Sequence, residues 1–275
     1  MNSKIRILAE SSIMIALASV LSLLKLAELP YGGSITLASM LPIVVIAYRH
    51  GTKIGLLCGL AYGVIQQLLG LNNLSYVTTW YSVLAVILLD YILAFAVIGF
   101  AGIFRKSDDK ASQSASMLYG VAFVCLLRYI MHTVSGATVW AGLSIPNNAA
   151  ILYSLSYNAT YMVPETIILL AVTAYVSSII DFRKEKPTRM KREYIDKVSL
   201  FCRMFAALPL VAGGIVATVY IFSKLQNPDS GEFDITLLSG NMLVPSIALA
   251  IGAVMTFGLF LAAYLREKNK TSEAD

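Results

Sequence analysis

The chain has little charge for its length. Of its 275 residues, 13% are charged and 57% are apolar, and the mean hydropathy is +0.73. A soluble globular domain has roughly 25% charged residues. The composition therefore excludes a soluble enzyme, a disordered chain and an ordinary nucleic-acid-binding protein. It indicates an all-α polytopic membrane protein.

Cysteine and catalytic motifs are also scarce. Cys58, Cys125 and Cys202 each lie in an apolar run without CxxC spacing, which argues against a disulfide framework and a metal site. The chain contains no phosphate loop, no HExxH and no GxSxG sequence, so we expect neither an enzyme nor a cofactor. If the protein drives uptake, the ATPase must be another chain.

Long apolar runs make up most of the sequence. A helix needs about 20 mostly apolar residues to cross about 30 Å of hydrocarbon. An additional short segment, at about 35–48, contains Pro42. The long runs lie at about 7–25, 54–70, 79–104, 115–140, 149–181, 199–223 and 241–265.

Lys and Arg gather in alternate connections between these runs. They precede the first run, follow the short segment as Arg49 and Lys53, and crowd 183–197, whereas 71–78 and 141–148 carry no charge. Cytoplasmic loops collect Lys and Arg, and the alternation holds only if the short segment crosses. We therefore predict eight helices with both termini in the cytoplasm. The alternative is seven helices with a re-entrant second segment.

The basic stretch 183–197 predicts a boundary. It separates a six-helix membrane domain, 1–182, from a two-helix transmembrane extension, 198–275, and we interpret it as a cytoplasmic linker attracted to anionic headgroups of the lipid bilayer. No sequence repeat relates the two parts, so an inverted-repeat transporter is not supported.

Ionisable residues within apolar runs are costly and predict function or pairing. Arg128 and His132 are four residues apart on one helix face, which Trp140 extends toward the outer end. The alternatives are an interfacial anchor for Trp140 and, for Arg128 and His132, a structural ion pair with Asp90 or Glu165.

The outer halves of three successive runs together predict a binding site. Aromatic faces attract cations, a buried carboxylate offsets positive charge, and His and Asn supply directional hydrogen bonds. We therefore expect a small-molecule site for a flat, cationic, hydrogen-bonding ligand. Its predicted residues are Asp90, Arg128, His132, Trp140, Tyr153 and Asn158.

The first run has two features of its own. Glu10 lies near the cytoplasmic boundary, where we expect a structural role. Ser12 and Ala16 form a small-xxx-small pair, which permits close approach by another helix.

Several short motifs occur in order between residues 5 and 182. They include Pro30-Tyr31-Gly32-Gly33-Ser34, Leu41-Pro42-Ile43, Arg49-His50-Gly51, Leu88-Leu89-Asp90-Tyr91, Leu127-Arg128-Tyr129-Ile130-Met131-His132, Ser135-Gly136 with Trp140, and Tyr153-Ser154-Leu155-Ser156-Tyr157-Asn158. In these motifs the chain resembles the thiamine-binding S components of energy-coupling factor (ECF) vitamin transporters. The resemblance implies a six-helix bundle in the bacterial cell membrane, here with a C-terminal two-helix hairpin.

The resemblance also implies a thiamine site near the outer face, closed by the loop between the first two helices. Its partners would be the ECF transmembrane coupling subunit, docked at Ser12 and Ala16, and two ATP-binding subunits. The implied ligand contacts are Asp90 with Tyr91, Arg128 with His132, Trp140, and Tyr153 with Asn158.

The chain departs from some members of that family. They carry Glu and Lys at the positions of Asp90 and Arg128, and a tryptophan and a glutamate at the positions of Gly33 and Leu37. Two ligand contacts are therefore either missing from this chain or supplied by Trp80 or Tyr81, after the uncharged stretch that follows Gly70.

Three alternative functions stay open. One is an S component for another heterocycle, such as a thiamine precursor pyrimidine. Another is a self-sufficient secondary transporter in which Glu165 and His132 carry protons. The third is a membrane scaffold.

Overall fold

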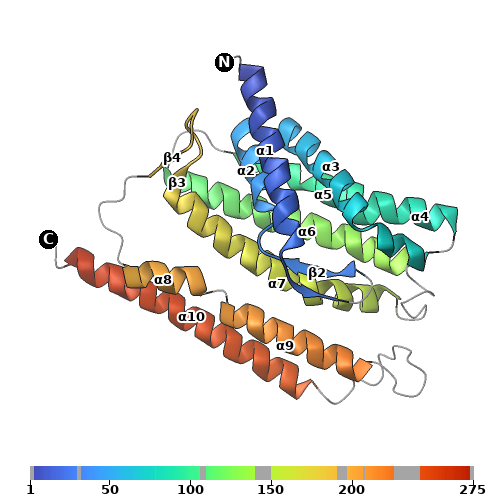
Figure 1. Cartoon of the computed structure of the whole chain (residues 1–275). Helices are drawn as coiled ribbons and strands as arrows, with labels where there is room; N and C mark the ends of the chain where they lie inside the picture. Colours follow the sequence, from blue (N-terminus) through green and yellow to red (C-terminus); the bar gives the residue numbers. More distant parts are fainter. Residues whose placement is uncertain are drawn as a thin grey trace.

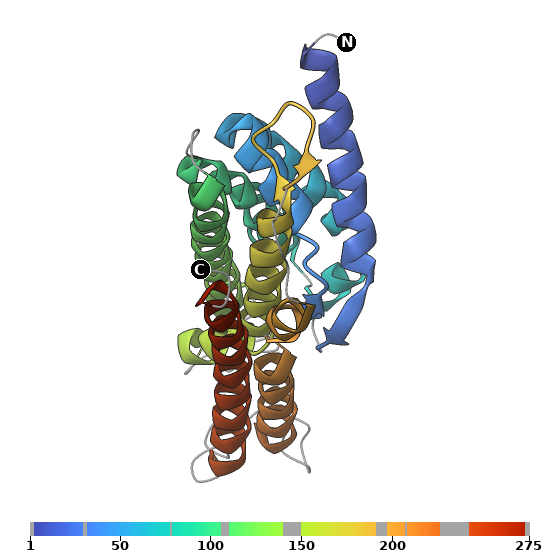
Figure 2. The ribbon, with the colours of Figure 1, turned by 90° about the vertical axis from the view of Figure 1, so that its left-hand side faces the viewer.

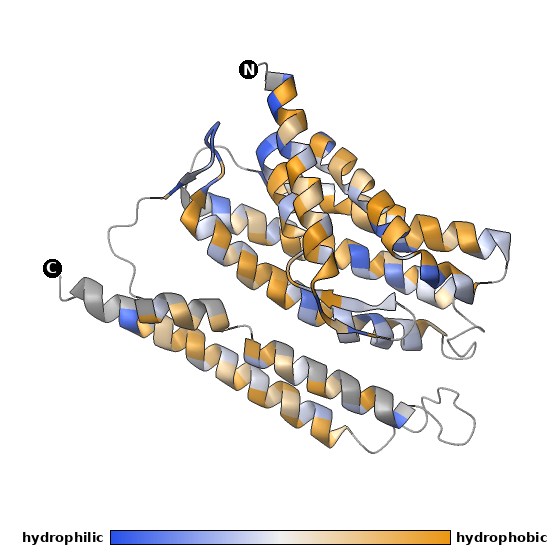
Figure 3. Ribbon diagram, viewed as in Figure 1, coloured by the Kyte–Doolittle hydropathy of each residue, from blue (hydrophilic) through white to orange (hydrophobic). Residues whose placement is uncertain are grey.

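The computed structural model describes residues 3–29, 32–77, 79–105, 110–139, 150–190, 197–206, 208–225 and 242–272. Long helices dominate these residues, packed side by side with apolar residues along their lengths (Figures 1 and 3). Within the described ranges, 6 helices are long and apolar enough to cross a membrane. They are Lys4–Leu23, Thr52–Leu69, Trp80–Phe104, Gln113–Thr138, Tyr153–Ile179 and Leu243–Ala263.

The first part of the chain forms a six-helix bundle, as predicted. Its fourth helix, residues 80–104, consists of four consecutive helical segments. The elements are α1 (Ser3–Leu23), α2 (Leu41–His50), α3 (Thr52–Leu69), η2 (Leu71–Tyr76), α4 (Trp80–Val86), η3 (Ile87–Leu93), α5 (Ala94–Ala96), η4 (Val97–Phe104), α6 (Lys110–Thr138) and α7 (Ala150–Ile179).

The short second segment forms the core of the bundle. Every residue of α2 from Leu41 to Arg49 is buried. Pro42 is tolerated because it lies in the first turn, where a backbone N–H would have no helical partner. The predicted helix at 35–48 therefore begins later than expected, because the residues before it form a strand.

Two short antiparallel hairpins join helices, and neither follows from the apolar pattern. β1 (Lys25–Glu28) pairs with β2 (Ser34–Thr36), with Glu28 opposite Ser34. β3 (Ile180–Asp181) pairs with β4 (Thr188–Arg189) at the end of α7. Figure 1 shows β2 near the end of α6 at Thr138 and the start of α7 at Ala150, and β3–β4 at the opposite ends of these two helices.

The helical run from 80 to 104 is less regular than the single helix that we predicted. Its segment η3 is a π-helix, a conformation that often occurs at functional sites. α3 packs closely against this run because two glycines of α3 face the backbone of the run. A Cβ atom on Gly59 would lie 2.6 Å from the carbonyl oxygen of Phe95, and one on Gly63 would lie 3.0 Å from that of Tyr91.

The C-terminal part differs from the prediction in one respect. The expected single helix at 199–223 is two helices, α8 (Lys197–Phe205) and α9 (Leu208–Leu225). Pro209 explains the break, since proline fits the first turn of a helix but disrupts its interior. α9 then packs along α10 (Leu243–Ser272).

The C-terminal pair lies against the bundle at α7 (Figure 2). A Cβ atom on Gly214 of α9 would lie 3.3 Å from Cγ of Pro164 in α7. The predicted fold class is therefore confirmed: an all-α membrane bundle with an additional helix pair, to which the structure adds the two small hairpins.

Candidate functional site

A cavity of about 320 Å³ opens within the bundle, at the end closed by the β1–β2 hairpin. Pockets for small ligands usually measure about 300–1,000 Å³, so this one fits a small molecule. α3, η2, η3, α6 and α7 supply most of the remaining walls, and α1, α4 and α5 also contribute lining residues. The polar and aromatic residues that line it include Thr36, Ser39, Tyr62, Gln66, Asn72, Asn73, Asp90, Tyr91, Phe95, Arg128, His132, Tyr153, Tyr157, Asn158, Tyr161 and Glu165.

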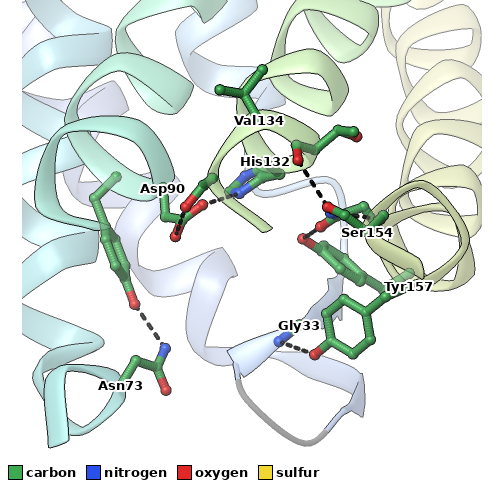
Figure 4. Close-up of polar contacts among 12 residues, drawn as sticks. Gly33, Asn73, Asp90, His132, Val134, Ser154 and Tyr157 are labelled. Carbon is green, nitrogen blue, oxygen red and sulfur yellow. Dashed lines mark hydrogen bonds and ion pairs between the residues drawn. The ribbon is translucent and has the colours of Figure 1, made fainter. Parts of the chain in front are cut away.

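Asp90 anchors one wall of the cavity from the π-helical segment η3. Its carboxylate lies 3.0 Å from Nδ1 of His132 and accepts a hydrogen bond of 2.7 Å from Oγ of Ser135 (Figure 4). An ionised Asp90 favours the tautomer with the proton on Nδ1. Nε2 of His132 is then an acceptor, and it is buried without a protein partner among the described residues.

Arg128 and Glu165 form a second charged group deeper in the cavity. Their side chains lie 3.3 Å apart and are nearly inaccessible. Glu165 also accepts a hydrogen bond of 2.7 Å from Oγ1 of Thr36, and the Arg128 guanidinium lies 4.7 Å from the ring centre of Phe95. Of the ion pairs that the sequence left open for these residues, the structure contains His132 with Asp90 and Arg128 with Glu165.

α7 presents a row of polar and aromatic groups to the cavity. The Tyr161 hydroxyl donates to Oδ1 of Asn158 over 2.6 Å, and Nδ2 of Asn158 donates to the carbonyl oxygen of Ser154 over 2.9 Å. The rings of Tyr157 and Tyr161 meet edge to face, with centroids 5.8 Å apart. Since Asn158 is bonded on both sides, its amide has a fixed orientation.

The β1–β2 hairpin and the η2 turn cover this end of the cavity. The backbone N–H of Gly33 donates to the Tyr157 hydroxyl over 3.4 Å, and Nδ2 of Asn73 donates to the Tyr91 hydroxyl over 2.7 Å (Figure 4). A Cβ atom on Gly33 would lie 2.8 Å from the Tyr161 ring. A larger residue at this position would therefore push the hairpin away from α7.

The structure brings most of the predicted site residues together. The two tryptophans are the exceptions: Trp80 is 78% exposed and does not line the cavity, and Trp140 lies outside the described residues. Tyr81, beside it in α4, is also exposed and does not line the cavity, so neither aromatic residue supplies a contact missing at Gly33 or Leu37. The predicted residues around the cavity are Asp90, Tyr91, Arg128, His132, Tyr153 and Asn158.

Sequence reasoning missed several residues of the cavity. Thr36 and Ser39 fall in the apolar second segment, and Asn73 lies in a loop considered only for its lack of charge. Tyr157 carries a weak signal, since it precedes Asn158 on a helix already rich in polar residues. The hydrogen bonds of Thr36, Asn73 and Tyr157 join different elements, at separations of 129, 18 and 124 residues.

The fold and the cavity together define a multi-pass helical membrane protein with an internal, polar and aromatic cavity of the size of a small molecule. Its sequence matches the family described as "Thiamine transporter protein (Thia_YuaJ)" over residues 8–182. The chain therefore belongs to this thiamine transporter family. The match ends at the β3–β4 hairpin, before the C-terminal helices.

Individual relatives agree with this assignment. Thiamine transporter ThiT of Bacillus subtilis (strain 168) is 38% identical over 170 residues, which cover 58% of this chain and 84% of the relative. ThiT of Lacticaseibacillus paracasei (strain ATCC 334) is 22% identical over 160 residues, which cover 55% and 74% of the two chains. These relatives are named as transporters, in agreement with the prediction that the protein is not an enzyme.

A solved structure shares the fold. The structure of ThiT from Listeria monocytogenes superposes with a TM-score of 0.50 at 25% sequence identity, covering 65% of this chain and 94% of that chain. The superposed part is about as long as the six-helix bundle.

Proposed function

We propose that this chain is the high-affinity thiamine-binding subunit, or S component, of an ATP-driven ECF uptake transporter in a bacterial cell membrane. It captures thiamine at the outer face and delivers it through a separate coupling module. The observation that carries the proposal is the combination of negative charge and aromatic rings in one cavity of suitable size.

The ionisable groups of the cavity favour a cation. Three carboxylates, Glu28, Asp90 and Glu165, and two cations, Lys25 and Arg128, line it. With His132 neutral, the lining has one net negative charge, which a thiazolium ring would neutralise. Six aromatic rings surround the same space, and cation–π contacts contribute about 0.5–2 kcal/mol each. They are those of Tyr62, Tyr91, Phe95, Tyr153, Tyr157 and Tyr161.

The remaining polar atoms suit an aminopyrimidine. Nε2 of His132 lacks a protein partner and, with the proton on Nδ1, accepts a hydrogen bond from an amino group. A buried acceptor without a partner costs about 1–3 kcal/mol, so a ligand donor at this position would restore that energy. Asp90 and Asn158 lie on the adjacent walls.

Coupling to another membrane protein is proposed for α1. Ser12 and Ala16 both lie on its exposed face, where small side chains permit close approach of a partner helix. The partners are the ECF transmembrane coupling subunit and two ATP-binding subunits, because the chain has no phosphate loop of its own. Both termini are then cytoplasmic.

The two other transport hypotheses fit the site less well. A neutral pyrimidine precursor would leave the net negative charge of the cavity uncompensated. A proton-driven secondary transporter would need a carboxylate that is able to change its charge, whereas Glu165 is bonded to both Arg128 and Thr36. We therefore favour thiamine as the ligand and ATP as the energy source.

Calorimetric titration of the purified protein tests the ligand. Thiamine should bind more tightly than either its pyrimidine or its thiazole half, because the halves engage only part of the cavity. Equal affinity for the pyrimidine half would favour the precursor hypothesis. The absence of binding by all these compounds would contradict the proposal.

Tryptophan fluorescence provides a second test, since the chain has only 2 tryptophans. If Trp140 stacks on thiamine, binding should quench the fluorescence of Trp80→Phe but leave that of Trp140→Phe nearly unchanged. Trp80 is the matched control because it is exposed and outside the cavity. If thiamine quenches the fluorescence of Trp140→Phe and binds this variant with unchanged affinity, Trp140 does not contact the ligand.

A further inference from the structure

Arg49, near the end of α2, has every donor occupied. Its Nε and one Nη donate to the two carboxylate oxygens of Glu10 on α1. Three further N–H groups donate to the carbonyl oxygens of Phe182 (2.6 Å), Lys184 (3.0 Å) and Glu185 (3.1 Å). A guanidinium carries five N–H donors, so these contacts use the complete set.

The Arg49 guanidinium joins three elements that are far apart in sequence. It connects α1 with α2 and with the β3–β4 turn that follows α7. The Arg49 side chain is 4% exposed, and Nε2 of His50 lies 3.1 Å from the same Glu10 carboxylate. A bidentate guanidinium–carboxylate contact fixes both distance and orientation, which a lysine ammonium at this position does not do.

α1 depends on this contact because it is lightly packed. Between residues 4 and 23, only Ser11, Ala18 and Ser22 are buried. Near the far end of the helix, Gln66 donates to Ser22 over 2.8 Å. The angle of α1 to the bundle is therefore set by few contacts, and Glu10 is the one bonded to a fully buried cation.

The Arg49 cluster is separated from the thiamine cavity by the length of α2. Neither Arg49 nor Glu10 lines the cavity. At the other end of the helix, Sδ of Met40 lies 2.8 Å from the Arg128 guanidinium within the site. A change at Arg49 should loosen the Glu10 end of α1. The other end, where Ser22 and Leu23 line the cavity, keeps its bond to Gln66, so ligand binding should stay intact.

We infer that Arg49 is a positioning residue for coupling: through Glu10 it holds α1 at the angle needed to dock the transmembrane partner. The inference rests on the proposed function, and it assigns to this buried ion pair a role in transport rather than in ligand binding. Arg49→Lys keeps the charge but loses the bidentate geometry. Glu10→Gln keeps the shape but loses the charge.

Asp181→Asn is the matched control. Asp181 bonds Arg183 over 2.9 Å within the same β3–β4 region. Among the described residues it makes no hydrogen bond or ion pair with α1. Hydrogen bonds from Arg183 lower the pKa of Asp181, so this carboxylate is ionised at neutral pH. The control thus removes a comparable ion pair at the same end of the molecule.

The test measures uptake and binding separately. Uptake of radiolabelled thiamine is followed in a bacterial host that carries an ECF coupling module and lacks its own thiamine-binding subunit; affinity is measured on the purified full chain. We expect Arg49→Lys and Glu10→Gln each to lower uptake at least about tenfold and to change the dissociation constant less than about twofold. The double variant should be no worse than Arg49→Lys alone, since that variant has already lost the bidentate contact to Glu10.

Four outcomes would overturn the inference. Wild-type uptake by Arg49→Lys and Glu10→Gln would show that the contact has no role in coupling. A parallel loss of uptake and affinity would show a general structural role, as would an equal loss in Asp181→Asn. If the wild-type chain binds no thiamine, the proposed function itself fails, and the inference fails with it.

Discussion

The six-helix bundle and the C-terminal helix pair differ in their content of ionisable residues. The bundle buries two arginines, and each is bonded to a carboxylate: Arg49 to Glu10 and Arg128 to Glu165. The apolar segments of the pair, 208–223 and 242–265, contain no ionisable residue other than tyrosine. Buried ion pairs add little net stability, so we interpret those of the bundle as functional, whereas the two helices of the pair pack through apolar residues.

This contrast predicts the largest effect on stability at Glu165. Glu165→Ala leaves the Arg128 guanidinium buried without its carboxylate, which should destabilise the protein by about 3–5 kcal/mol. Thermal unfolding in detergent measures the loss, and Glu165→Gln should fall between this variant and the wild type. A melting temperature equal to that of the wild type would show that water or another group compensates Arg128.

The next largest effect concerns affinity. Asp90→Asn keeps the size of the side chain but removes its charge, and it should weaken thiamine binding by about 1.5–3 kcal/mol, the range for a hydrogen bond to a charged group. Calorimetry gives the affinity and thermal unfolding gives the stability. Loss of stability with unchanged affinity would make the Asp90–His132 contact a purely structural pair.

The stability of the C-terminal helix pair should depend on packing rather than on charged groups. A Cβ atom on Gly213 would clash with the backbone of Ala248, so Gly213→Leu should cost about 1–3 kcal/mol of stability through overpacking. Gly258→Leu is the control, because nothing lies within 4 Å of that position. Thiamine affinity should stay unchanged in both variants. A large loss of affinity in Gly213→Leu would mean that α9 transmits its position to Glu165 through Pro164.

The smallest expected effect follows removal of the whole pair. A chain that ends after Met190 should still fold and bind thiamine with unchanged affinity, since no residue of α8–α10 lines the cavity. The cut belongs here rather than at Arg183, because Arg49 is bonded to the carbonyl oxygens of Lys184 and Glu185. A monodisperse truncated protein without binding would show that the pair contributes to the site.

Much of the bundle and part of the site could be predicted from local patterns. The long apolar runs end within a few residues of the observed helices α3, α6 and α7. Asp90, Arg128 and His132 are charged or polar groups within such runs, and all three line the cavity. Because charged groups are energetically costly in a membrane, these residues can be recognised as candidates without knowledge of the fold.

The remaining features of the fold and the site depend on contacts between residues that are distant in the sequence, which a local pattern does not reveal. The pairing of Arg128 with Glu165 and of Asp90 with His132 is set by the relative positions of α6, α7 and the π-helical segment. Thr36 looked like part of an apolar helix, yet it lies in β2 and bonds Glu165. The interruption between α8 and α9 was missed because Pro209 lies within a long apolar run.

The shortness of α2 has a consequence for how the protein enters the membrane. With 10 residues, this helix is about 15 Å long at 1.5 Å per residue, half of the roughly 30 Å hydrocarbon layer. Because it also carries Arg49, α2 on its own is a poor substrate for insertion by the translocon. We therefore expect α1, α2 and α3 to be released into the lipid as one unit, after Glu10 has formed its ion pair with Arg49.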